Sequence, residues 1–246
     1  MMMGGRFRLL LVLAVAGFSA CSRGAPPAVE AVSTAPAVIA PGEWTQDLDA
    51  ALALGKQEGL LVFMNFMGSD WCGVCIQTEK SVFKTDNWAA YAASNFVMVA
   101  LDFPENEALV PPAWRARNEA LRRQLQVEGF PTFIIVDPVD NTPVARLGAY
   151  RGMTAEGFIQ DVRRIVRLTP GAIAHAEAGL VPETLTRYRE IIARLRAAQG
   201  ELDAWLKTQP ERNEENLARH RDFLQKLDRQ HDEADQLEGV APAPSG

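Results

Sequence analysis

Apolar and polar positions between residues 43 and 168 follow two spacings, one typical of helices and the other of strands. Apolar residues at helical spacing predict helices over residues 44–58, 72 to about 91, 113–126 and 155–167. Apolar runs bounded by turn residues predict strands over residues 60–67, 96–103, 132–136 and 143–150. The predicted order is therefore helix, strand, helix, strand, helix, strand, strand, helix.

This order predicts a mixed α/β domain over residues 43–168. Strands joined through helices favour parallel pairing. Residues 137–142 carry the turn residues of a hairpin between the last two strands, which adds an antiparallel pair. Gly59 ends the first predicted helix, and Thr154 is a good N-cap for the last. We therefore expect a mixed sheet with flanking helices.

A separate helical pattern fills residues 171–238 and predicts an antiparallel helical hairpin. Gln209-Pro210 breaks the pattern, and Asn213 begins its second half. The apolar stripe carries Leu185, Tyr188, Ile191, Ile192, Leu195, Leu202, Trp205, Leu206, Leu217, His220, Phe223, Leu224, Leu227, His231 and Ala234. The hairpin packs on itself or on the α/β domain, or it is an arm that docks a partner or a second copy. On this stripe we interpret His220 and His231 as polar seam residues rather than ligands. Residues 239–246 are predicted to be disordered.

The N-terminus has the pattern of a secretory signal over residues 1–20. Arg6 and Arg8 precede the apolar run at residues 9–18, which would rise only about 15 Å as a helix, too short to span a bilayer. The stretch Phe18-Ser19-Ala20-Cys21 resembles a bacterial lipobox, with Phe where Leu is usual. This resemblance implies a lipid on Cys21; the alternative is a plain signal peptide with an incidental cysteine.

Residues 21–42 are rich in Ala and Pro and predict a semi-extended tether. Ser22, the residue after the lipidated cysteine, resembles the sorting signal for the outer membrane. The expected location is therefore the periplasmic side of a bacterial cell envelope, with the protein held at the membrane by acyl chains.

The composition is that of an ordinary globular protein. The 246 residues are 48% hydrophobic and carry a net charge of −6, which argues against collagen-like, wholly disordered and multispan membrane proteins. Because neither the whole chain nor the hairpin has a basic balance, we expect no nucleic-acid partner.

The candidate chemistry lies in the pair Cys72 and Cys75, which follows a predicted strand and opens a helix. Unpaired N–H groups at a helix N-terminus favour a thiolate on the first cysteine. The second lies on the same helix face and can attack a mixed disulfide to close an intramolecular bridge. A zinc site would need further ligands, and the histidines (His175, His220 and His231) lie about a hundred or more residues away. We therefore predict thiol–disulfide exchange without a metal or cofactor.

Several motifs in residues 43–168 resemble the thioredoxin superfamily. Trp71-Cys72-Gly73-Val74-Cys75 resembles its WCxxC active site, and Gly129-Phe130-Pro131-Thr132 resembles the loop that carries its cis proline. A closer similarity is to exported thioredoxin-like proteins with a GSDWCxxC stretch. Residues 68–75 match that stretch. Residues 101–104 match the VDFP motif of the same group, and residues 118–121 match its N-x-x-L motif in the helix before GFPT.

The resemblance implies roles for individual residues. Cys72 is the nucleophile, Cys75 the resolving thiol of a redox-active disulfide, and Pro131 the cis proline that shapes the substrate groove. Trp71 is an exposed ring beside the thiols, or alternatively part of the core. The remaining residues expected to line the groove or tune the pair are Asp70, Gly73, Val74, Phe130 and Thr132.

Two departures from the family pattern affect the expected chemistry. Gly73-Val74 replaces Gly-Pro between the cysteines, and Asn65 stands near the place of a buried acid. Because Asn cannot accept a proton, the proton of the resolving thiol would pass through Asp70 or water. The alternatives are that Asn65 is a hydrogen-bonded buried amide and that Asp70 caps the helix.

The expected function is thiol–disulfide exchange with exported proteins that contain cysteines or disulfides, in the reducing direction, with a separate electron donor or acceptor. The alternative is a partner-binding module whose cysteines are idle or bind copper(I), which two soft thiolates can hold.

Overall fold

The structure, a computed structural model, describes residues 39–239 of the 246-residue chain. The predicted signal peptide, Cys21, most of the predicted tether and the tail after Gly239 lie outside the described residues. Within the described range, no helix is both long and apolar enough to cross a membrane.

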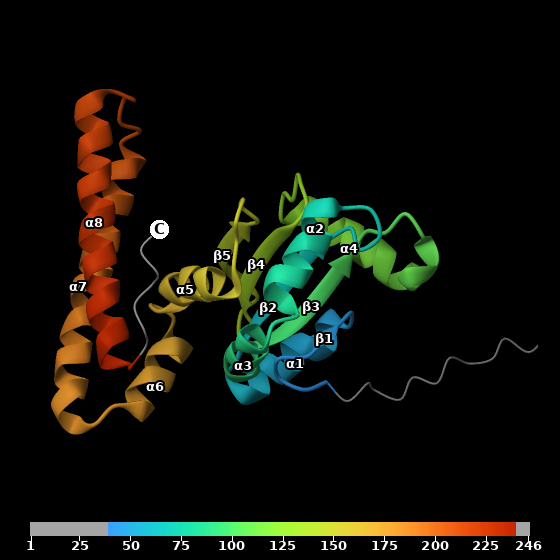
Figure 1. Cartoon of the computed structure of the whole chain (residues 1–246), viewed down its shortest axis with the longest axis horizontal. Coiled ribbons are helices and arrows are strands. Elements are labelled where there is room, and N and C mark those ends of the chain that lie inside the picture. Colours follow the sequence, from blue (N-terminus) through green and yellow to red (C-terminus); the bar gives the residue numbers. More distant parts are fainter. Residues whose placement is uncertain (1–38, 240–246) are drawn as a thin grey trace, which may run out of the picture. The chain divides into compact units, whose positions relative to one another are not determined.

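Five strands form one mixed sheet, so the predicted fold class is confirmed. In chain order they are β1 (Trp44–Thr45), β2 (Leu61–Met67), β3 (Phe96–Asp102), β4 (Thr132–Asp137) and β5 (Thr142–Gly148). Their order across the sheet is β1-β3-β2-β4-β5 (Figure 1). β1 and β2 run parallel to β3, whereas β4 runs antiparallel to both β2 and β5.

The helices precede, connect and follow these strands. The α-helices of the described residues are α1 (Leu48–Glu58), α2 (Gly73–Thr78), α3 (Asp86–Asn95), α4 (Pro112–Gln124), α5 (Ala155–Val166), α6 (Pro170–Gly179), α7 (Pro182–Lys207) and α8 (Glu214–Leu237). A π-helical turn, η1 (Glu79–Phe83), continues α2, and a short 3-10 helix, η2 (Glu107–Leu109), lies between β3 and α4.

The expectation of parallel pairing across helices is right for β2 and β3 but wrong for β2 and β4. The segment after α4 returns the chain to the end of the sheet where β2 finishes, so that Thr132 pairs with Phe66. Because β4 begins at that end, it runs in the opposite direction to β2.

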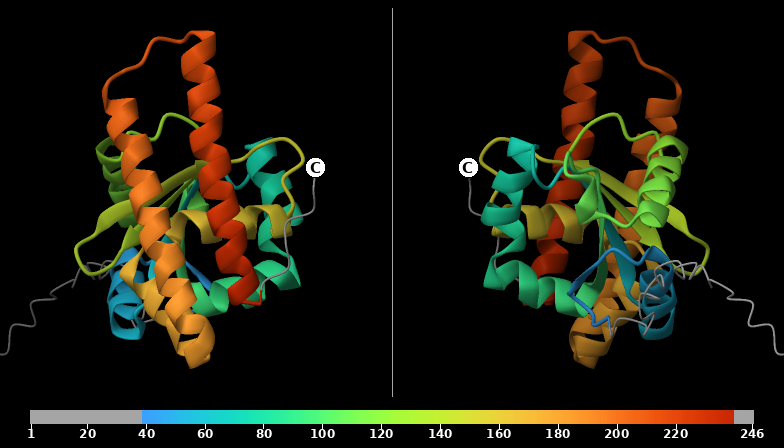
Figure 2. Two further views of the ribbon diagram at one scale, coloured as in Figure 1. Left: turned by 90° about the vertical axis from the view of Figure 1, so that its left-hand side faces the viewer. Right: turned by 90° about the vertical axis from the view of Figure 1, so that its right-hand side faces the viewer.

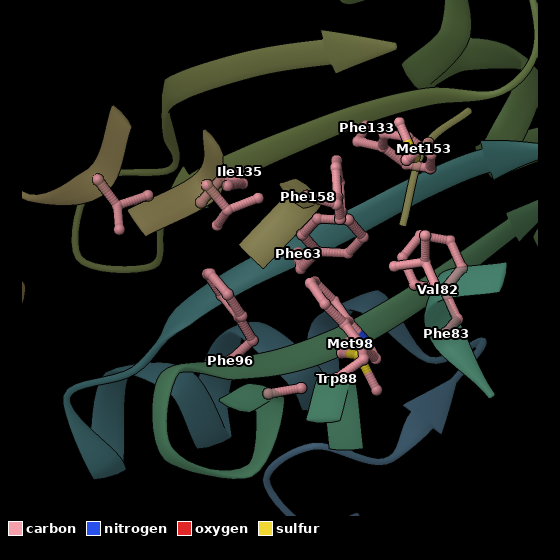
Figure 3. Close-up of a cluster of buried hydrophobic side chains, with 13 residues drawn as sticks. Phe63, Val82, Phe83, Trp88, Phe96, Met98, Phe133, Ile135, Met153 and Phe158 are labelled. Carbon is pink, nitrogen blue, oxygen red and sulfur yellow. The ribbon is translucent and has the colours of Figure 1, made fainter. Parts of the chain in front are cut away.

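Two apolar cores lie on the two faces of the sheet. One contains an aromatic cluster around Phe63, whose ring stacks on Phe133 at 5.6 Å between centroids and meets Trp88 edge to face at 5.3 Å (Figure 3). Helices α3 and α5 and the turn η1 cover this face. The other core packs α1 and α4 against the opposite face. Each fully buried Phe contributes about 2 kcal/mol through the hydrophobic effect, so both faces of the sheet are fixed in place.

The first helix begins later than predicted. Asp47 accepts the backbone N–H of Ala50 and caps α1, which therefore starts at Leu48. Trp44–Thr45, predicted as helix, form strand β1 instead. Gly59 ends α1 in the left-handed conformation with φ 69°, as the sequence predicts.

The helix predicted from residue 72 to about 91 is interrupted. After α2 the chain continues into the π-helical turn η1, and the helical conformation ends at Phe83. Thr85 has an extended backbone, and its side chain accepts the N–H of Trp88 to cap a new helix, α3. A Thr followed by an acidic first turn is a strong N-cap signal, and here it overrides the continuous apolar spacing.

The helical segment predicted over residues 171–238 contains a third helix, α6, before the two helices of the hairpin. Thr169 accepts the N–H of Ala172 and caps this helix, with Pro170 at its first position. Pro is well tolerated at a first helical position, so these residues open a helix.

Helices α7 and α8 form the predicted hairpin and lie side by side in both views of Figure 2. Ion pairs Arg194–Glu233 and Lys226–Glu201 give the two helices an antiparallel register. The predicted stripe is buried only in part, since Leu206, Leu217 and Leu224 remain 43–45% exposed near the distal end. His220 stacks on Trp205, and His231 lies against Arg167.

Candidate redox site

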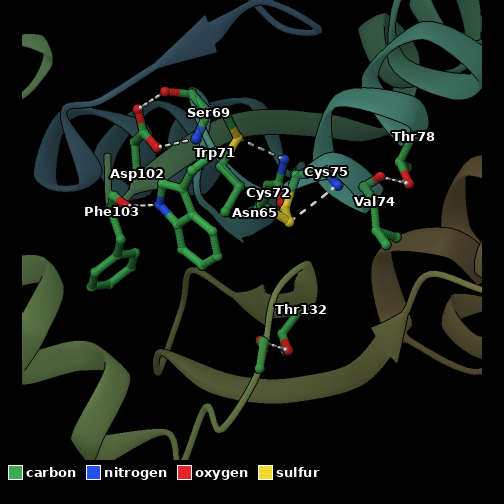
Figure 4. Close-up of a disulfide and its surroundings, with 12 residues drawn as sticks. Asn65, Ser69, Trp71, Cys72, Val74, Cys75, Thr78, Asp102, Phe103 and Thr132 are labelled. Carbon is green, nitrogen blue, oxygen red and sulfur yellow. Dashed lines mark hydrogen bonds between the residues drawn. A yellow bond between two sulfur atoms is a disulfide. The ribbon is translucent and has the colours of Figure 1, made fainter. Parts of the chain in front are cut away.

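The structure brings Cys72 and Cys75 together as a disulfide at the start of α2 (Figure 4). Their Cα atoms are 5.2 Å apart. Cys72 has an extended backbone and is the N-cap of α2, whereas Cys75 lies in the first turn. Both side chains are largely buried, with 7% and 6% exposure.

The helix start places a hydrogen-bond donor on the first sulfur. The backbone N–H of Cys75 points to Cys72 Sγ at 3.2 Å. In the reduced pair the same donor would face a thiolate, and such a bond favours the ionised form of Cys72. This contact gives a structural reason for Cys72, rather than Cys75, to be the nucleophile.

Asn65 lies in the middle of β2 among the residues around the disulfide (Figure 4). Its side chain is 3% exposed, and Nδ2 donates to Met67 Sδ at 3.1 Å. Its Oδ1 is buried without a hydrogen-bond partner. The interpretation of Asn65 as a hydrogen-bonded amide therefore holds for the nitrogen but is wrong for the oxygen.

Asp70 does not cap α2, because the N-cap of that helix is Cys72. Its carboxylate accepts the backbone N–H of Glu105 at 2.9 Å and that of Asn106 at 2.8 Å. These hydrogen bonds, led by the one from Asn106, lower the pKa of Asp70 below its ordinary value. Asp70 thus stays ionised and fixes the loop after β3, so its expected role as the helix cap is wrong, whereas its expected role in proton transfer stays a prediction.

The neighbours of Asp70 hold the same loop. Ser69 donates from its backbone N–H and its hydroxyl to the carboxylate of Asp102, at 2.9 and 2.6 Å. The indole Nε1 of Trp71 donates to the backbone oxygen of Phe103 at 2.8 Å. Sequence reasoning missed the pair Ser69–Asp102, which could be found only from the parallel register that sets Met67 opposite Asp102.

Trp71 is 46% exposed, which confirms its expected position at the surface rather than in the core. Its ring lies directly over Gly68, where a Cβ would come within 2.4 Å of the indole. Only glycine fits beneath the ring in this arrangement. Gly73 and Val74 are exposed at the start of α2, beside the cysteines.

The second predicted motif closes the site from β4. The Phe130–Pro131 peptide bond is cis, as the resemblance implied, and Pro131 is buried. Thr132 donates its hydroxyl to the backbone oxygen of Gly129 at 2.8 Å. The ring of Phe130 meets that of Trp71 edge to face at 5.9 Å. The structure therefore brings together the residues before the nucleophile and those before the cis proline.

Among residues 39–239, no group of three or more His, Cys, Asp and Glu side chains is arranged to hold a metal ion.

Known proteins have sequences similar to the part of this chain that carries the site. Residues 43–138 match a family model described as thioredoxin-like. The chain is 29% identical over 135 residues to the disulfide bond reductase DsbH of Chlamydia pneumoniae, which covers 55% of this chain and 79% of that protein. It is 24% identical over 123 residues to the thioredoxin-related protein DsbJ of the same organism, covering 50% of this chain and 35% of that protein.

Among solved structures, a DsbH oxidoreductase matches with 29% identity and a TM-score of 0.48, covering 55% of this chain and 91% of that one. A thioredoxin from Thermus thermophilus matches with 21% identity and a TM-score of 0.40, covering 54% and 92%. The family match, the relatives and the cysteine pair agree with one another. Residues 43–138 therefore lie in a thioredoxin-like domain, and this domain carries the CxxC pair of a thiol–disulfide oxidoreductase.

Proposed function

We propose that this protein reduces disulfides in exported proteins while it is tethered to the bacterial envelope through a lipid on Cys21. The observation that carries the proposal is the Cys72–Cys75 disulfide at a helix start, with the N–H of Cys75 on Cys72 Sγ. The cis Phe130–Pro131 bond belongs to the same site. Disulfide exchange requires two thiols that can form and break a disulfide with each other.

In the reducing direction the dithiol form begins the cycle. The Cys72 thiolate attacks one sulfur of a substrate disulfide, forms a mixed disulfide and expels the other substrate sulfur as a thiolate, which takes up a proton. Cys75 then loses its proton to solvent and attacks Cys72 Sγ. This step releases the second substrate sulfur and leaves the Cys72–Cys75 disulfide. Two electrons have passed to the substrate, and a separate dithiol donor must return them.

The direction is supported by a relative. The protein that matches over 79% of its own length is named a disulfide bond reductase. The similar segment of this chain contains the cysteine pair, and the direction of exchange depends on the site together with its electron donor.

The location is supported by the sequence before residue 43. A basic segment, an apolar run and a small-residue exit precede Cys21, and an Ala/Pro-rich stretch follows it. At about 3 Å per residue, residues 22–42 would hold the folded part clear of the membrane surface. Periplasmic proteins with cysteines would then be within reach.

The decisive experiment is a redox titration of the pair in the Cys21→Ser chain, followed by thiol trapping in dithiol buffers. We expect a reversible two-electron transition between about −270 and −120 mV, with a value near the lower end for a reductase. A disulfide whose reduction potential lies below about −300 mV would be structural and would contradict the proposal.

Single-cysteine variants test the order of attack. Cys75→Ser should accumulate a mixed disulfide between Cys72 and a substrate, whereas Cys72→Ser should form none and have no turnover. Stoichiometric copper(I) binding that needs both cysteines, with no disulfide turnover, would favour the binding-module alternative. For the anchor, Cys21→Ala should move the protein from the membrane fraction to the soluble fraction; unchanged membrane association would contradict lipidation at Cys21.

A further inference from the structure

A cavity of about 580 Å³ lies beside the redox site, on the side of the loop that follows β3. Trp71 and Phe130, the residues before the nucleophile and before the cis proline, form one part of its wall. Phe103 and Pro104 from the loop form another part. The remaining lining residues, most of them charged, are Asp102, Glu107, Arg115, Ala116, Glu119 and Arg122. The cavity therefore begins where a substrate cysteine must arrive.

Three aromatic rings, those of Trp71, Phe103 and Phe130, pack together on the side of the wall next to the redox site. The rings of Phe103 and Phe130 stack at 5.0 Å between centroids, and Trp71 meets Phe130 edge to face. The guanidinium of Arg122 lies over both phenyl rings, 5.8 Å from Phe103 and 5.3 Å from Phe130. Its Nε also donates to the backbone oxygen of Val127 at 3.2 Å, which fixes the side chain against the rings.

The loop that supplies Phe103 is held by the segment that supplies the nucleophile. Ser69 binds Asp102, Asp70 binds the backbone of Glu105 and Asn106, and Trp71 binds the oxygen of Phe103. Three consecutive side chains before Cys72 thus attach to residues 102–106. Because these contacts fix the loop that supplies Phe103, the cavity needs little rearrangement to bind a ligand.

We infer that this cavity is a specificity pocket for a large aromatic side chain adjacent to the target cysteine of the substrate protein. The inference rests on the proposed function, because the occupant is the polypeptide that forms the mixed disulfide with Cys72. A segment that brings its sulfur to Cys72 passes Trp71 and Phe130, which places a flanking side chain against the rings. Aromatic side chains bind such walls through apolar burial and edge-to-face contacts.

The test compares two peptide disulfides that differ only in having Phe or Ala next to the cysteine, with Phe placed on each side in turn. For the wild-type chain we expect kcat/KM to be about tenfold or more higher for a Phe peptide, a typical discrimination for an apolar pocket. In Phe103→Ala that preference should fall to near unity. Equal kcat/KM for the Phe and Ala peptides in the wild-type chain would overturn the inference.

Two further variants test whether the preference comes from the cavity. Leu109→Ala is the matched control, because Leu109 is an exposed apolar residue that follows the same loop but does not line the cavity; it should keep the preference. Asp70→Asn weakens the attachment of the loop at an exposed site and should reduce the preference without removing a ring. If Asp70→Asn and Phe103→Ala both keep the full preference, the pocket is not its source.

A small disulfide without side chains, bis(2-hydroxyethyl) disulfide, separates this inference from the proposed function. If the wild-type chain reduces neither this compound nor the peptides, the proposed function fails. If it reduces this compound and both peptides equally well, the function stands and the pocket is excluded.

Discussion

The guanidinium of Arg167, just after α5, pairs with the carboxylate of Asp235 in α8, and the two side chains are only 1% and 3% exposed. Arg167 also donates to the backbone oxygen of His231 at 2.7 Å and lies 3.2 Å from the carboxylate of Glu238. One buried cation thus receives three partners from the last turns of α8. The contact fastens the C-terminal hairpin to the α/β domain.

Removal of Asp235 should destabilise the protein strongly, because it leaves Arg167 buried without its main partner. We expect Asp235→Ala to lower the free energy of unfolding by about 3–5 kcal/mol, measured by urea denaturation. Asp232→Ala is the matched control, because Asp232 lies in α8 like Asp235 and pairs with Arg164 of α5 but is 52% exposed. Its loss should cost about 1 kcal/mol or less. Equal losses in the two variants would contradict a dominant role for the buried pair.

Stability should fall on mild acidification because of His231. Burial, together with the nearby guanidinium groups of Arg167 and Arg164, lowers the pKa of His231 to about 4. The unfolded chain binds a proton there near pH 6.5, but the folded chain does so only near pH 4. The contribution is therefore complete above about pH 6.5 and is lost as pH falls toward 4, amounting to about 2 kcal/mol between pH 7 and 5.

The measurement is urea unfolding of the wild type and His231→Gln at both pH values. The burial-raised pKa of Glu238 acts in the opposite direction, but Glu238 is present in both proteins, so the difference between them isolates His231. A difference that does not change between pH 7 and 5 would show that His231 does not titrate in this way.

Gly68→Ala should displace the indole of Trp71. A Cβ at Gly68 would come within 2.4 Å of that ring, so the ring must move and give up its hydrogen bond to Phe103. We expect a loss of about 1–3 kcal/mol in unfolding free energy and a change in Trp fluorescence. Gly73→Ala is the matched control, because a Cβ at Gly73 would meet no atom within 4 Å. This variant should change neither the unfolding free energy nor the Trp fluorescence. Similar spectra for Gly68→Ala and the wild type would contradict the close packing.

Asn65→Asp should give the resolving step a new pH dependence. A carboxyl at this buried position would have a raised pKa and, once ionised, would accept the proton of the Cys75 thiol. We expect the release of substrate from a preformed mixed disulfide to accelerate about tenfold or more above that pKa. Asn65→Leu provides burial without a base and should lack the new step. Identical pH profiles for the two variants would show that position 65 does not exchange protons with Cys75.

The parts of the fold predicted from sequence are those fixed by local chemistry. The four long strands follow from apolar runs, and the cysteine pair follows from its place between β2 and α2. The start of α8 follows from the cap at Asn213. Each of these signals lies within a few residues of the feature that it predicts.

The failures depend on contacts between distant segments. Asp70 was expected to act at its own helix, but its partners lie 35 and 36 residues later in the chain. The direction of β4 depends on where the loop after α4 rejoins the sheet, which no local pattern encodes. The partial exposure of the hairpin stripe likewise reflects how much of α7 and α8 the rest of the molecule covers, a property of packing rather than of spacing.

Strand β1 fixes the end of the sheet at which the chain enters the domain. The chain enters the domain beside the start of β3, where the N–H of Gly42 donates to the oxygen of Phe96 and Trp44 pairs with Met98. The loop that surrounds the cysteines leaves from the other end of β3, after Asp102. The six residue steps between Phe96 and Asp102 span about 20 Å. A pull on the start of the domain would thus act at the opposite end of β3 from the loop that surrounds the cysteines.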